Sequence, residues 1–124
     1  MLKFLSTAAV LFSAAAAKAH EWTPTYPKFN PSYVEGVSVT TMKIFNKRND
    51  ASFYKISLYD EEWNEIPFAS ESRVVEVDYL EQKSINIYIL EQDCDRLEYI
   101  CSKSMLQVGK VDSSGVNTRI CSRF

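Results

Sequence analysis

The segment KSINIYIL, residues 83–90, decides the fold class of this chain. Ile85, Ile87 and Ile89 alternate with residues of another character, and a period of two is that of a β-strand with one buried face. The segment SFYKISLYD, residues 52–60, repeats the pattern. Both segments therefore predict strands that bury one face in a shared core.

Similar runs recur along the chain. We expect strands at 37–45, 52–60, 72–80, 83–90, 96–103 and 115–124, with turn-forming clusters between them. The lead-in EWTPTYPKFNPSYVEG, residues 21–36, contains three prolines and is expected to be an extended edge segment. Beyond the N-terminal segment no stretch has apolar residues at helical spacing. Seven short strands in about 100 residues predict an all-β, seven-stranded immunoglobulin-like β-sandwich with Greek-key connections.

The N-terminus has the layout of a signal peptide. Lys3 precedes an apolar run over 4–17, and Ala17 and Ala19 are small residues of the kind that signal peptidase requires. We therefore expect a signal peptide at 1–19 and a single mature domain at 20–124. No second apolar segment follows, so we expect no membrane insertion after cleavage and a periplasmic or secreted protein.

The net charge of the chain limits the classes of partner that it is expected to bind. Cleavage would remove two lysines and no acid, which leaves 12 basic residues against 16 acidic ones and a net charge of −4. A mildly acidic chain without a basic cluster is a poor candidate for binding nucleic acid or an anionic membrane.

His20 would become the first residue of the mature chain, and an N-terminal histidine is a candidate copper ligand. A terminal amine and its imidazole bind Cu(II), but functional sites add a second histidine, and this chain has one. The same lone histidine, expected at a mobile terminus, gives a nucleophilic serine or cysteine no base. We therefore expect no enzyme, no metal and no cofactor, and keep a copper-binding protein using His20 as the weakest alternative.

The turn at 60–65 is rich in acidic residues. It lacks the glycine and the terminal glutamate of a calcium loop, so we expect a solvated hairpin tip. For Trp63 in this turn we favour a lid over the core.

Three cysteines all lie in the last third of the chain. If the last two strands pair around the turn VGKVDSSG, Cys101 and Cys121 fall near one another, and an oxidising compartment favours their bridge. A Cys94–Cys101 bridge across a tighter turn is the competing possibility. We favour Cys101–Cys121 with Cys94 unpaired.

From about Tyr26 to Phe124 the chain resembles the N-terminal domain of periplasmic pilus-assembly (fimbrial) chaperones. The pieces that carry the resemblance are Phe29, MKIFN ending at Asn46, IPF at 66–68, YLEQKSINIYI, LEYICSKS and TRICSRF. A subclass of these chaperones joins the last two strands by a disulfide, which agrees with Cys101–Cys121. The family uses an exposed strand to complete the fold of secreted pilus subunits by β-augmentation.

The resemblance therefore implies non-catalytic, chaperone-like binding of an extracytoplasmic protein partner through the last strand. The predicted partner-binding residues are Val116, Thr118, Arg119 and Ile120, with Arg119 as a carboxylate contact.

Several positions depart from the family pattern. Tyr26 stands where an arginine is expected, and Cys121 stands near the expected last-strand lysine. The donor stretch lacks large hydrophobic residues at Asp112 and Ser114, and we expect no second domain. A structural component of a cell-surface or virion-type assembly is therefore the main alternative function.

Overall fold

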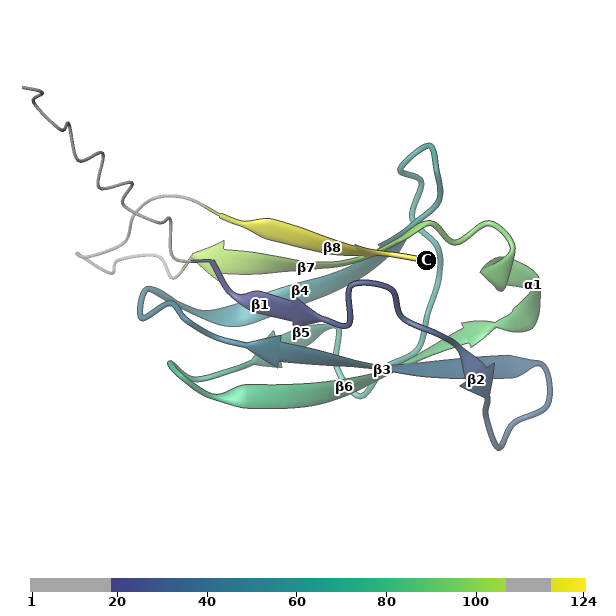
Figure 1. Cartoon of the computed structure of the whole chain (residues 1–124), viewed down its shortest axis with the longest axis horizontal. Coiled ribbons are helices and arrows are strands. Elements are labelled where there is room, and N and C mark those ends of the chain that lie inside the picture. The colour runs from purple at the N-terminus through teal and green to yellow at the C-terminus, as the bar shows by residue number, and fades with distance from the viewer. Residues whose placement is uncertain (1–18, 107–116) are drawn as a thin grey trace, which may run out of the picture.

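The computed structural model describes residues 19–106 and 117–124 and has two antiparallel sheets, so the predicted all-β class is confirmed (Figure 1). Residues 1–18 of the predicted signal peptide lie outside the described residues. So does Val116, one of the four predicted partner-binding residues.

The first sheet is built on β3, the strand Val37–Phe45. On one side it pairs with β6, Gln82–Leu90, and on the other with two short strands, β1 at Glu21–Thr23 and β2 at Asn30–Pro31. The second sheet has the order β5-β4-β7-β8. Its strands are β4 Ala51–Tyr59, β5 Val74–Glu76, β7 Tyr99–Leu106 and β8 Arg119–Arg123.

Three of the predicted strands agree closely with the structure. The predicted segments 37–45, 52–60 and 83–90 match β3, β4 and β6 to within one residue at each end. The lead-in is extended, as predicted, but it is divided into β1 and β2, so the described residues hold eight strands in place of seven. A four-residue helix, α1 at Glu91–Cys94, follows β6 and was not predicted.

The core lies between the two sheets and follows the predicted alternation. Tyr54, Ile56 and Leu58 of β4 are at most 1% exposed, and the isoleucines of β6 face them from the first sheet. The other members of the cluster are Trp22, Met42, Ile44, Ile66, Val77, Leu97 and Ile100. Each such aliphatic side chain contributes about 1.5–3 kcal/mol by leaving water, so this layer is the main source of stability.

The inner face of β7 and β8 is partly polar, whereas that of β4 is apolar. Ser102, Ser104 and Ser122 are fully buried. The N-terminal segment satisfies two of them: His20 Nε2 lies 2.6 Å from Ser102 Oγ, and Ser122 Oγ donates to the Pro24 carbonyl at 2.6 Å. Buried hydroxyl groups require such partners, so the N-terminal segment completes this side of the core.

The turn between β3 and β4 carries a buried ion pair that lies beside Ser104 of β7. Arg48 donates to both carboxylate oxygens of Asp50, from Nε at 2.8 Å and from Nη2 at 2.7 Å. Its Nη1 donates to Ser104 Oγ at 3.1 Å. This guanidinium therefore joins the turn to β7.

Candidate functional site

A disulfide fixes β8 to β7. Cys101 and Cys121 stand opposite one another in the antiparallel register and are bonded, with their Cα atoms 4.0 Å apart. This is the pairing that the sequence favoured, and Cys94, at the end of α1, is free. The disulfide makes the outermost strand of the second sheet a covalently held edge.

On one side of β8, two residues have backbone groups without a backbone partner in the described part of the chain. The Thr118 carbonyl accepts from Ser104 N–H, and Phe124 N–H donates to the Glu98 carbonyl, both at 2.9 Å. The even-numbered residues of β8 therefore direct their backbone groups toward β7, within the plane of the sheet. Odd-numbered residues therefore direct theirs outward. Arg123 N–H donates to the Thr25 carbonyl at 3.0 Å, and within the described ranges no backbone group bonds the outward side of Arg119 or Cys121.

The predicted partner-binding residues differ in what they present. Arg119 is exposed, whereas Ile120 is half-buried against the core. Thr118 is also half-buried, and its N–H donates to Ser104 Oγ at 2.7 Å. At this edge the side chain of Arg119 and the backbone of residues 119 and 121 are therefore the groups that a partner can reach.

Arg119 lies over an aromatic cluster on the outer face of the second sheet. Trp63 stacks on Tyr99 with ring centroids 4.2 Å apart and an angle of 5° between the planes. The guanidinium carbon of Arg119 is 4.8 Å from the centre of the Trp63 ring and 5.8 Å from that of Tyr59. The prediction that Trp63 covers the core is wrong: it is 45% exposed and packs on the outer face, because the 60–64 turn folds toward that side.

The acidic turn is organised by hydrogen bonds from its own residues. The Asp60 carboxylate accepts from the N–H groups of Glu62 and Asn64 at 2.9 and 2.8 Å, and these bonds hold the pKa of Asp60 below its usual value. The carboxylate thus closes the turn that carries Trp63.

His20 is buried, contrary to the expectation of a mobile terminus. It is 2% exposed, its ring lies 4.6 Å from that of Tyr54, and burial lowers its pKa from 6.5 to about 4. Within residues 19–106 and 117–124, no three histidine, cysteine or acidic side chains gather as a metal site requires. The His20 side chain is therefore part of the packed interior.

Two further cations stand beside Arg119 and were missed from the sequence. Lys103 is directly opposite Arg119, and Lys55 is directly opposite Lys103 on the next strand. The register was available once Cys101 and Cys121 were paired, because that pair also sets Lys103 against Arg119. Only the register of β4 against β7, which places Lys55 opposite Lys103, could not be obtained without the structure.

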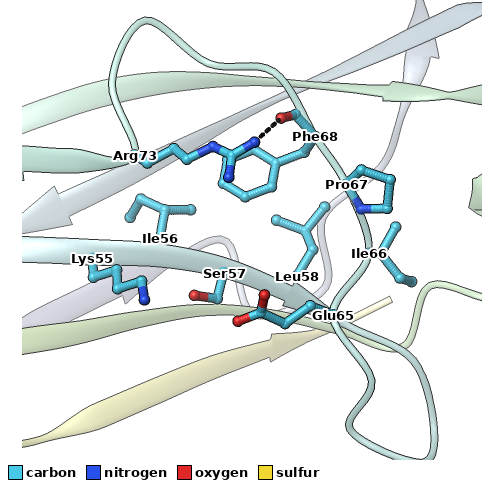
Figure 2. Close-up of a pocket in the computed structure, with 9 residues that line it drawn as sticks. All are labelled: Lys55, Ile56, Ser57, Leu58, Glu65, Ile66, Pro67, Phe68 and Arg73. Carbon is cyan, nitrogen blue, oxygen red and sulfur yellow. Dashed lines mark hydrogen bonds between the residues drawn. The ribbon is translucent and has the colours of Figure 1, made fainter.

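Two hollows adjoin this row of cations. A shallow cavity of about 130 Å³ is lined by Lys55, Ser57, Tyr59, Cys101, Lys103 and Arg119. A larger one of about 300 Å³ opens between β4 and the 65–73 segment, where Lys55, Ser57 and Glu65 lie on the opposite side of β4 from Ile56 and Leu58 (Figure 2). In the larger hollow Arg73 lies against Phe68, with its guanidinium carbon 5.4 Å from the ring centre.

The chain matches no protein-family model and none of the curated proteins with which it was compared. Among the residues that the structure describes, no helix has the length and apolar character needed to cross a membrane.

Proposed function

We propose that this protein is an extracytoplasmic binding protein that holds a protein partner by pairing a strand with the free edge of β8. The proposal includes an N-terminal signal peptide, a periplasmic or secreted location, and chaperone-like binding without catalysis. A cross-strand disulfide supports the location, because such bonds persist in oxidising compartments.

We further propose that the domain is an immunoglobulin-like sandwich of the pilus-chaperone type. The pairing of β3 with β6 and the order β4-β7-β8 correspond to strands B–E and C–F–G of the immunoglobulin class. A disulfide between the last two strands also agrees with the resemblance.

The observation that carries the function is that the outward backbone of Arg119 and Cys121 has no backbone partner within residues 19–106 and 117–124. Natural sheets usually protect an edge by covering it or by placing charges along it, because an open edge recruits other strands. Here Thr25 covers the end of β8 at Arg123 and β1 lies close to β8, but among the described residues no backbone group bonds the outward side of Arg119 or Cys121. An incoming strand at this edge would extend the second sheet beyond β8.

The test is to remove one outward N–H group. The tagged full-length chain is recovered from the extracytoplasmic fraction of its native host, and mass spectrometry identifies the stoichiometric companion. In the variant Arg119→Pro we expect this companion to be lost, because proline cannot donate to an added strand. The variant Arg119→Gln removes the side-chain charge but keeps the backbone N–H, so it should retain the companion.

Ser84→Pro is the matched control. Tyr88 exchanges hydrogen bonds with Ala69 beyond the edge of β6, so Ser84, four residues earlier, also directs its N–H away from β3. This variant should retain the companion, and retention by Arg119→Pro as well would contradict the proposal. A dimer without a companion, dissolved by Arg119→Pro, would support the structural-assembly alternative, in which two β8 edges pair.

A further inference from the structure

The outer face of the second sheet carries three cations in one row. Lys55, Lys103 and Arg119 lie directly opposite one another on β4, β7 and β8, and all three are exposed. Neighbouring strands are about 4.8 Å apart, so the three residues share a strip about 10 Å wide. Like charges placed directly opposite across strands destabilise a sheet. The mutual repulsion of the three cations therefore does not stabilise the fold.

Among the described residues no carboxylate forms an ion pair with the row. In the described part of the chain Lys47, Lys83, Arg96 and Arg123 each form an ion pair, and the three residues of the row form none. Lys43 also lacks an ion pair there, but it stands opposite Thr23 and Ser84, not opposite another cation. The cations of the row are thus unpaired and concentrated, which is the electrostatic condition for binding an anion.

The row encloses a small cavity with hydroxyl groups in its lining. The hollow of about 130 Å³ is bounded by the three cations together with Ser57, Tyr59 and Cys101. A volume of about 130 Å³ is enough for one small oxyanion group. The contacts of Arg119 with Trp63 and Tyr59 hold its guanidinium at the rim, so that its planar set of donors is oriented before a ligand arrives.

We propose that this cavity binds a doubly charged tetrahedral oxyanion, the phosphate or sulfate group of a ligand that extends over the open sheet face. Three positive charges exceed what a single carboxylate can neutralise, and Arg and Lys are the usual donors to phosphate and sulfate oxygens. Glu65 is the acidic side chain drawn beside Ser57 (Figure 2), and within the described residues it forms no ion pair with Lys55. This site does not depend on the strand-pairing function proposed above.

The experiment is an isothermal titration of the full chain with inorganic phosphate and with inorganic sulfate. The variant Lys103→Gln should weaken binding roughly tenfold, because it removes a charge-assisted donor from the centre of the row. Glu65→Gln should strengthen binding by removing a repulsive charge. Lys43→Gln, on the first sheet, is the matched control and should bind as the original chain does.

Two more probes identify the source of the anion. Dextran sulfate represents a sulfated polysaccharide, and vesicles containing phosphatidic acid represent a lipid headgroup. Binding of any probe that is lost in Lys103→Gln but kept in Lys43→Gln supports the site and shows which class of ligand it takes. No binding of any probe at millimolar concentration, or equal binding by both variants, would overturn it. Lys103→Gln leaves the backbone of the β8 edge intact. If this variant loses anion binding but still captures the protein companion, the anion site is distinct from the β8 edge.

Discussion

At the scale of single residues, His20 makes the stability of the fold depend on pH. Its pKa is about 4 in the folded chain and 6.5 when unfolded, so below pH 6.5 the unfolded chain takes up a proton that the folded chain does not. The stabilisation is therefore complete above pH 6.5 and is lost as the pH falls toward 4, by up to roughly 3 kcal/mol. Urea unfolding at several pH values measures this loss.

The variant His20→Gln isolates that contribution from the protonation of acidic residues. Glutamine still offers Ser102 a hydrogen bond but does not titrate, so its free energy of unfolding should fall less between pH 6.5 and 4. Equal losses in the two chains would contradict a buried neutral histidine. The burial of His20 was not predictable, because its partner Ser102 is 82 residues away and nothing local in the sequence connects them.

At the scale of elements, the disulfide is expected to hold β8 in place. It closes a separation of 20 residues, and the chain-entropy account gives such a bridge about 3 kcal/mol. Replacing both Cys101 and Cys121 by serine should lower the free energy of unfolding by about that amount. Cys94→Ala is the control and should cost about 1 kcal/mol or less, since Cys94 is half-buried and unbridged. A double variant as stable as this control would contradict the prediction.

The elements differ in how far the sequence could predict them. β4 and β6 followed from the alternation of their buried apolar residues, whereas β3 followed from its many β-branched residues, since its inner face begins with Ser38 and Thr40. On β7 and β8 the inner face mixes isoleucines with buried serines, so the alternation is weaker and the pairing of the two strands was inferred from the disulfide. Trp63 was misplaced for a similar reason: Tyr99, on which it stacks, comes from another strand, and a turn sequence does not show toward which face it folds.

At the scale of the whole molecule, the polar end of the sandwich joins parts that lie far apart in the sequence. Arg48 contacts Asp50 within its turn, Ser104 on β7 and, at 3.4 Å, Thr118 before β8. Asn46 extends the network by donating to the carbonyls of Ala51 and Val77, both at 2.8 Å. The β8 edge proposed for binding therefore depends on this network for its position.

We expect Arg48→Met to lower the free energy of unfolding by about 3–5 kcal/mol, because it leaves the buried Asp50 carboxylate without the guanidinium. Urea unfolding followed by the fluorescence of the buried Trp22 measures this. The double variant Arg48→Met/Asp50→Leu should recover most of the loss, since both buried charges are then gone. Lys47→Ala breaks an exposed ion pair with Glu21 and is the control, with a cost of about 0–1 kcal/mol. If Arg48→Met costs no more than this control, the network does not hold the two sheets together, and the position of β8 must depend on the disulfide alone.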